Sequence, residues 1–420
     1  MYLMKYFALV LTLIPIVYFL YGTLARGSWR LVDSFVVGVI LYQLGVCVLL
    51  FKVGVDTDSL VIFQTSTLCL FLSVLSSRWF SFSSKISLEN LYIPYYQKIY
   101  FQLFIIGYFG ILLLNVIIFS VIFLKFKDLL LSGEPGALLD VRKQIAGGER
   151  GYMWPGLIKQ IRDIITPAII AYCILFLNGR NRYYFLIPLV IACLMSVFIG
   201  GQRFPLIVLI LVIVTSVLIS DSKAIKELFT LNNIIKVLLV LAIILLLNSF
   251  LGRGSFTVMG FVAMVGGLFE RMTLTVPLEN YKVASYFKEN SFSMFSIWTS
   301  ELASLIPGNR FTLSNDLHAY MGGSNQGNST LGGAMSGYYN AGYIGVVIYV
   351  VAFVGLLSLM DYLIKKSNSR LLLSLRVVLF FLIPMWYSFF HVFLSGSLVF
   401  ILFILMVVFF KIVLPRNAYK

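Results

Sequence analysis

The sequence predicts an all-α protein that crosses a membrane many times. Of its 420 residues, 60% are hydrophobic and 12% are charged, whereas a soluble protein has about 25% charged residues. A helix needs about 20 apolar residues to cross a ~30 Å hydrocarbon core. Runs of this length recur along the whole chain. We therefore expect one polytopic membrane domain over residues 1–420, with about 11 (10–12) transmembrane helices.

The expected spans follow one another with short connections in most places. They cover residues 5–22, 32–54, 59–77, 101–124, 163–179, 183–199, 204–220, 233–251, 338–360, 372–391 and 395–414. The fifth to seventh runs are short and closely spaced, so a hairpin or a tilted helix is the alternative there.

Charges alternate between the short connections of these spans. The loops after the first and third spans carry Arg26, Arg30 and Arg78, whereas the loop after the second span carries Asp56 and Asp58. Because basic short loops stay in the cytoplasm, this pattern places the C-terminus inside and the N-terminus outside. An even number of spans, with one run missed, is the alternative.

The net charge of +15 has two interpretations. One is positive-inside topology together with affinity for anionic lipid. The other is a cationic cavity for a phosphate-bearing substrate. Nucleic acid is not an expected partner, because no basic run with interleaved aromatic residues lies outside the spans. The four cysteines all lie in apolar runs, which predicts neither a disulfide framework nor a zinc site.

Two connections are too long to be simple turns. They cover residues 125–162 and 252–337, and the topology places both on the outside of the membrane. Loops longer than about 15 residues are usually functional or disordered, and the apolar residues in both loops disfavour disorder. In the second loop, residues 256–269 predict a re-entrant or interfacial helix. Residues 292–306 predict a second surface helix, with Trp298 as its interfacial anchor.

Arginines in the outside connections are candidates for binding phosphate. A guanidinium group presents a planar fork of donors that fits a phosphate, and several of them can stabilise a departing pyrophosphate. Arg203 and Arg253 are flanked by glycines, which let the backbone approach a ligand. The full set is Arg142, Arg150, Arg203, Arg253 and Arg271. Ordinary contact with lipid headgroups is the alternative for each of them.

Residues 323–345 form the largest run of small polar residues in the chain. Its hydroxyl, amide and phenol groups are of the kind that distinguish sugar hydroxyls, and tyrosine rings stack on sugar faces. The candidate sugar-binding residues are Asn328, Ser329, Thr330, Tyr338, Tyr339 and Asn340. Gly342 and Gly345 have a structural alternative, which is to let helices pack closely.

His318 is a candidate base, with a polar interfacial position as the alternative. The triplet from Asp56 to Asp58 resembles the metal-binding Asp-x-Asp of many glycosyltransferases, with an acidic loop as the alternative. No phosphate-binding loop or zinc-hydrolase motif is present, so we expect no ATP, metal or other cofactor.

Three stretches of the chain resemble the O-antigen polymerases, the Wzy-type oligosaccharide repeat unit polymerases. The first is the turn from Gly200 to Arg203, and the second is the loop from Arg142 to Tyr152. The third joins Gly327–Thr330 to Gly337–Gly345. The layout, with many spans and two sizeable periplasmic loops, is also similar to that of this family.

The resemblance implies a GT-C-like fold in the bacterial inner membrane, with the active site facing the periplasm. Such an enzyme transfers a growing glycan from undecaprenyl pyrophosphate to the next lipid-linked unit, without metal or nucleotide. Arg203, Arg253 and Arg271 would then bind the pyrophosphate. The acceptor hydroxyl would need positioning and a base, for which Glu270, Asp316 and His318 are candidates that the sequence does not separate. The implied partners are the lipid-linked oligosaccharide, membrane lipids, a flippase and a chain-length regulator. A flippase or transporter for the same substrate, and an O-antigen ligase, are the alternative functions.

Overall fold

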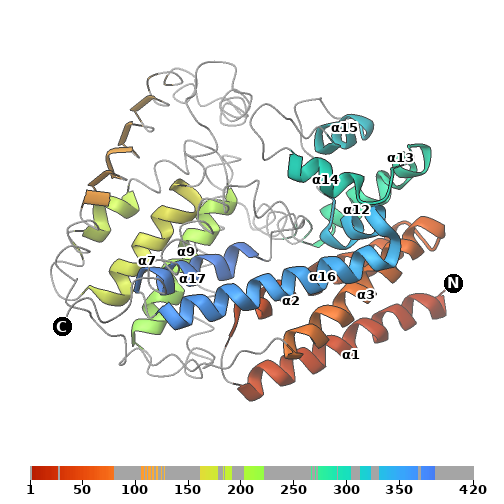
Figure 1. Cartoon of the computed structure of the whole chain (residues 1–420), viewed down its shortest axis with the longest axis horizontal. Helices are drawn as coiled ribbons and strands as arrows, with labels where there is room; N and C mark the ends of the chain where they lie inside the picture. The colour runs from red at the N-terminus through yellow and green to blue at the C-terminus, as the bar shows by residue number, and fades with distance from the viewer. Residues whose placement is uncertain are drawn as a thin grey trace. The chain divides into compact units, whose positions relative to one another are not determined.

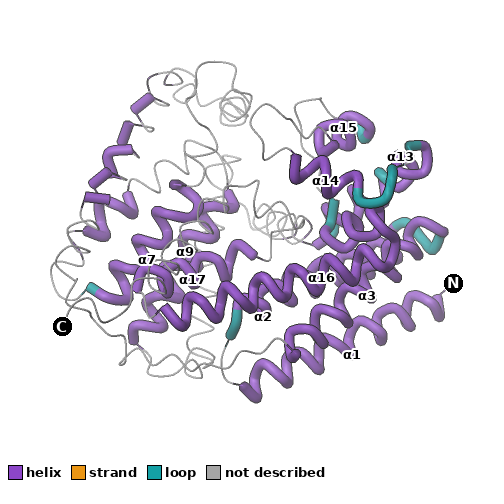
Figure 2. Tube along the Cα trace, in the orientation of Figure 1, coloured by secondary structure: helices purple, strands orange, loops and turns teal. Residues whose placement is uncertain are grey.

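The computed structural model describes about half of the chain, and all of it as helix or short loop (Figure 2). The described residues are 2–26, 29–79, 161–177, 183, 185–191, 203–221, 266, 270, 273–290, 292–303, 313–322, 331–367 and 370–383, with scattered positions between 106 and 127. The chain divides into two compact units. The first comprises Met1–Ser83, Val262–Asp361 and Ile383–Leu398, and the second comprises Ser84–Phe261, Tyr362–Leu382 and Val399–Lys420.

Four of the described helices are long and apolar enough to cross a membrane. They are Met4–Arg26, Leu31–Lys52, Thr57–Trp79 and Gly333–Ile364, and they coincide with the first, second, third and ninth expected spans. An all-helical protein with several candidate spans is therefore confirmed. Three shorter apolar helices, Asp163–Phe176, Ile207–Val217 and Leu372–Leu382, coincide with the fifth, seventh and tenth runs. Of the other four runs, 233–251 and 395–414 lie outside the described residues, and 101–124 and 183–199 are described only in part.

Three consecutive helices of the first unit pack against one another: α1 (Tyr2–Arg26), α2 (Leu31–Lys52) and α3 (Thr57–Trp79) (Figure 1). Polar side chains join them inside the apolar bundle. The amide nitrogen of Gln43 donates to the hydroxyls of Thr12 and Thr67, at 3.1 Å each. Such hydrogen bonds, together with small residues, hold helices together where lipid supplies no hydrophobic driving force.

The second long loop contains four short helices: α12 (Thr275–Lys282), α13 (Ala284–Glu289), α14 (Ser296–Ala303) and α15 (Leu313–Tyr320). α12 packs on α2 and α3. Gly45 of α2 allows this approach, because a Cβ there would lie 2.5 Å from the carbonyl carbon of Thr273. α14 is a shorter version of the surface helix expected over 292–306. The stretch 256–269 lies almost entirely outside the described residues.

α16 (Gly333–Ser367) is two helical pieces separated by a sharp bend. The bend falls at Ala341 and Gly342, and Gly342 has φ 59° and ψ −147°, a conformation that favours glycine. In a straight helix, Gly337 and Gly345 would be about 12 Å apart. A Cβ on Gly345 would instead lie 2.8 Å from the carbonyl carbon of Gly337. The first piece therefore folds back on the second, and Gly345 has the close packing that was the structural alternative for it.

The described part of the second unit is a small apolar bundle. A π-helical turn, η2 (Ile161–Ile165), leads into α7 (Thr166–Phe176), which packs against α9 (Arg203–Asp221) and α17 (Arg370–Leu382). Ile170, Cys173 and Leu209 are buried between them.

Candidate functional site

In the first unit, the turn between α2 and α3 meets the second long loop in a cluster of charged and polar side chains. The Asp58 carboxylate pairs with the Lys288 ammonium of α13 at 2.5 Å. Lys52 pairs with Glu270 at 3.5 Å, with both side chains 57% exposed. The Tyr281 hydroxyl donates to Asp56 Oδ2 at 2.6 Å. We call this cluster the Asp56 surface; its members are Lys52, Asp56, Asp58, Glu270, Tyr281 and Lys288.

Asp56 and Tyr281 shift each other's pKa in opposite directions. Burial by itself would raise the pKa of Asp56, but hydrogen bonds from Tyr281 and Ser59 outweigh it and lower that pKa below its ordinary value. The hydrogen bond to Asp56 raises the pKa of Tyr281, and burial and the nearby carboxylates add to the rise. The pair is therefore held as a carboxylate and a neutral phenol, which makes Asp56 a hydrogen-bond acceptor rather than a strong base.

Replacing Tyr281 with phenylalanine is expected to weaken the attachment of α12 by about 0.5–1 kcal/mol, since the lost hydrogen bond is exposed. A lowered Asp56 pKa contributes stability above about pH 4 that is lost as the pH falls through the folded pKa. A raised Tyr281 pKa contributes stability that is present below about pH 10 and lost above it. Unfolding free energies of the wild type and Tyr281→Phe should therefore differ at pH 7, and the difference should shrink as the pH falls below about 4. A difference that does not shrink on acidification would contradict this assignment.

Tyrosines from the two pieces of α16 lie next to the α12–α13 segment. The Tyr339 ring is stacked on Phe287, with centroids 3.8 Å apart and an interplanar angle of 11°. Tyr338 meets the edges of Tyr339 and Tyr343, at 5.8 and 5.4 Å, and the Tyr343 hydroxyl donates to Gln64 Oε1 at 2.8 Å. Tyr338 and Tyr339 are both half-buried, and Phe287 covers one face of Tyr339, whereas Tyr343 is 43% exposed. Tyr338 and Tyr343 are thus the rings best placed to meet a ligand.

Asn340, expected to bind sugar, is buried and engaged inside the protein. Its Nδ2 donates to the Ser336 carbonyl oxygen at 2.7 Å, and its Oδ1 accepts from the Trp298 backbone N–H at 3.2 Å. The Trp298 indole N–H donates to Ser336 Oγ at 3.2 Å. Both side chains therefore fasten α14 to the first piece of α16, and the anchoring of Trp298 at a membrane interface stays a prediction.

The remaining predicted site residues are spread over the chain. Glu270 lies on the Asp56 surface, and His318 is half-buried on α15, next to Leu317 of the apolar cluster beneath that helix. Arg203 is the first residue of α9 in the second unit. The other predicted residues lie outside the described part of the chain: Arg142, Arg150, Arg253, Arg271, Asn328, Ser329 and Thr330. The convergence of the arginines therefore stays a prediction.

Sequence reasoning missed the residues that attach the loop to the spans. Asn280 of α12 donates to the Tyr42 hydroxyl of α2 at 2.7 Å and accepts from the Gly332 N–H at 3.3 Å. It also missed Tyr281 and Lys288 as partners of Asp56 and Asp58. The polar residues 279–282 follow an apolar stretch, which indicates a segment that forms hydrogen bonds. No local sequence pattern identifies a partner more than 200 residues away in the chain.

The Asp56 surface, the half-buried Tyr338 and the exposed Tyr343 offer carboxylate acceptors, ammonium donors and aromatic rings in the first unit. This chemistry suits a ligand that carries many hydroxyl groups. Within the described ranges, no group of three or more His, Cys, Asp or Glu side chains is arranged to hold a metal ion.

The chain matches no protein-family model, no curated protein and no solved structure. The polymerase resemblance therefore rests on the motifs and the layout of the chain alone.

Proposed function

We propose that this protein is a membrane glycosyltransferase that polymerises lipid-linked oligosaccharide repeat units of a surface polysaccharide. The observation that carries the proposal is the folding of the second long loop onto the ends of α2, α3 and α16. This folding places α12 and α13 against the Asp56 surface on one side and against the Tyr339 ring on the other, and Tyr338 and Tyr343 follow next to Tyr339. A substrate with a polar glycan and a polyprenyl tail suits a surface where a loop packs on membrane spans, because its tail stays in the bilayer while its sugars contact the loop.

The proposed reaction joins two lipid-linked substrates. The bond between the anomeric carbon of the growing glycan and its undecaprenyl pyrophosphate breaks, and a glycosidic bond forms to a hydroxyl of the incoming unit. That hydroxyl gives its proton to a base, for which Glu270, Asp316 and His318 remain open. The pyrophosphate leaves with the electron pair, and Arg203, Arg253 and Arg271 are proposed to stabilise its charge.

A carrier for the same substrate is less well supported. Transporters place polar and ionisable groups near the middle of the membrane. In α1, α2 and α3, the described charged residues lie within the first or last turns, at positions such as Lys5, Arg26 and Asp33. Near the middle of these helices, the Gln43 amide nitrogen donates to the Thr12 hydroxyl.

Tyr338 and Tyr343 provide the sharpest cellular test of the proposal. We expect the Tyr343→Ala and Tyr338→Ala variants to lower polymer yield about fivefold each, the effect of losing roughly 1 kcal/mol of aromatic contact. The measurement is the glycan ladder of cells that lack the gene and carry each variant, normalised to protein level. The wild-type gene should restore the ladder that the deletion removes.

Tyr21→Ala is the matched control, because Tyr21 is 72% exposed on α1 and is remote in sequence from the proposed site. Its ladder should equal that of the wild type. Unchanged ladders for both Tyr338→Ala and Tyr343→Ala would contradict the proposed glycan-binding surface. A deletion strain with a normal ladder would contradict the proposed function.

A further inference from the structure

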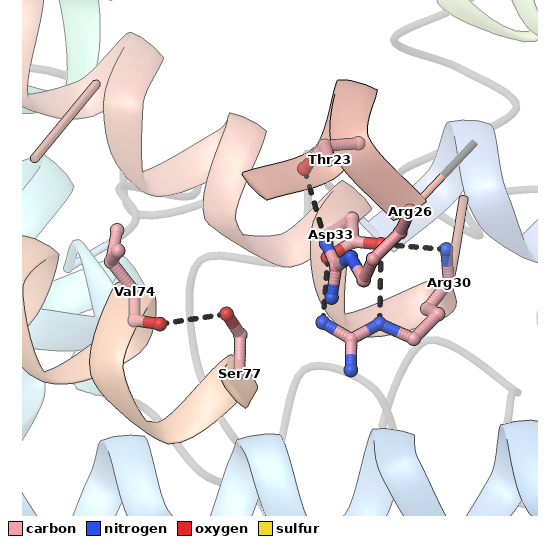
Figure 3. Close-up of polar contacts among 6 residues, drawn as sticks. All are labelled: Thr23, Arg26, Arg30, Asp33, Val74 and Ser77. Atoms are coloured by element: carbon pink, nitrogen blue, oxygen red, sulfur yellow. Dashed lines mark hydrogen bonds and ion pairs between the residues drawn. The ribbon is translucent and has the colours of Figure 1, made fainter. Parts of the chain in front are cut away.

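A second charged cluster lies at the other end of α1, α2 and α3, away from the Asp56 surface. Its centre is Asp33, which is fully buried and accepts from Arg26 Nη2 at 2.9 Å and from Arg30 Nη2 at 3.0 Å (Figure 3). The backbone N–H and Nε of Arg30 also donate to Asp33 Oδ2, at 2.8 and 3.3 Å. One buried carboxylate thereby fixes two guanidinium groups.

A third arginine arrives at the same end from α3. The Arg78 guanidinium lies over the Tyr18 ring of α1, 3.7 Å from its centroid. Gly22 gives it room, because a Cβ on Gly22 would lie 2.5 Å from Arg78 Nη2. Arg78 is also close enough to Arg26 for the two positive charges to repel.

The cluster therefore combines three positive charges with one negative charge from Asp33. Arg26 donates hydrogen bonds to Asp33 and Thr23 from one nitrogen, Nη2, and its side chain is 30% exposed. A guanidinium group has five N–H donors, so donors of Arg26 and of the exposed Arg78 remain for an anion. An anion placed between them would also relieve the repulsion of charges that Asp33 and Tyr18 hold close together.

We propose that Arg26 and Arg78 form a binding site for the phosphate of an anionic phospholipid such as phosphatidylglycerol. The surface beside the cluster points to a lipid rather than to a free phosphate. Leu24 of α1 is 64% exposed, and Trp79, which follows Arg78, is 83% exposed. Exposed tryptophan is typical of the membrane–water interface. The acyl chains would lie along the apolar face of α1, a contact that inorganic phosphate cannot make.

Titration of the detergent-purified protein, followed by native mass spectrometry, tests this site without any transfer reaction. The probes are phosphatidylglycerol and phosphatidylcholine with identical acyl chains. We expect tighter binding of phosphatidylglycerol, and we expect Arg78→Gln to weaken it about fivefold, the contribution of one basic residue. Phosphatidylcholine binding should not change. Arg78→Lys, which keeps the charge, should retain part of the preference, and it replaces Arg78→Gln if that variant does not fold.

Lys52→Gln is the matched control, since it removes one exposed positive charge at the opposite end of α2. It should leave the lipid preference unchanged. Equal binding of the two lipids by the wild type would overturn the proposal, as would equal losses in Arg78→Gln and Lys52→Gln. Millimolar inorganic phosphate that displaces phosphatidylglycerol completely would assign the cluster to free anions and overturn the lipid assignment. None of these outcomes depends on the proposed transferase activity.

Discussion

Replacing Asp33 with asparagine is expected to destabilise the protein by about 3–5 kcal/mol, the usual cost of breaking a buried ion pair. The carboxylate accepts from both Arg26 and Arg30 and has no exposed surface. An amide keeps its size but loses the charge, so two guanidinium groups would face each other without compensation. The change would also weaken the start of α2, because Asp33 accepts the backbone N–H of Arg30.

The matched control is Glu270→Gln, the same change of carboxylate to amide in an ion pair that is 57% exposed on both sides. Exposed pairs contribute about 0–1 kcal/mol, so this variant should unfold almost as the wild type does. Denaturant titration of the purified protein, monitored by tryptophan fluorescence, measures both. Similar stability losses in the two variants would contradict the assignment of Asp33 as a buried centre of charge.

Gly345→Ala is expected to reduce polymer yield at least tenfold and to destabilise the protein by about 1–3 kcal/mol. The new methyl group would collide with the backbone of Gly337, where the two pieces of α16 touch. The chain can escape the collision only by opening the bend at Gly342. That movement would carry Tyr338 and Tyr339 away from Tyr343 and Phe287.

Gly355→Ala is the matched control in the same helix, because a Cβ on Gly355 would have no described atom within 4 Å. Alanine is the better helix former, so this variant should keep the wild-type ladder and the wild-type stability. Glycan ladders and denaturant titrations of both variants show whether a loss comes from the collision with Gly337 or from replacing any glycine of α16 with alanine. A Gly345→Ala variant with a normal ladder would show that the folded-back piece of α16 is dispensable for function.

Hydropathy alone was sufficient to predict the positions of the first three helices. Runs at 5–22, 32–54 and 59–77 became α1, α2 and α3, since each is uniformly apolar and bounded by polar residues. The ninth run was expected as a span over residues 338–360. The structure instead starts α16 at Gly333 and bends it at Gly342. Spacing alone does not distinguish glycines that bend a helix from glycines that pack on a neighbour.

The candidate site was only partly predictable. Tyr338 and Tyr339 were identified from composition, but the sequence could not tell that Phe287 covers one face of Tyr339. The pairing of Asp56 with Tyr281 joins residues separated by 225 positions, which no local pattern encodes. Asn340 was expected to contact sugar because amides often do, whereas its hydrogen bonds here are internal.

The central proposal is tested most directly by a reaction with purified components. The protein, reconstituted in lipid nanodiscs, is mixed with undecaprenyl-pyrophosphate-linked repeat units extracted from a strain that lacks the gene. We expect a ladder of longer glycans on the same lipid, without added nucleotide or metal, and a weaker ladder for Tyr343→Ala. A wild-type protein that forms no new glycosidic bond, or that joins glycan only to added lipid A core, would contradict the proposed polymerase.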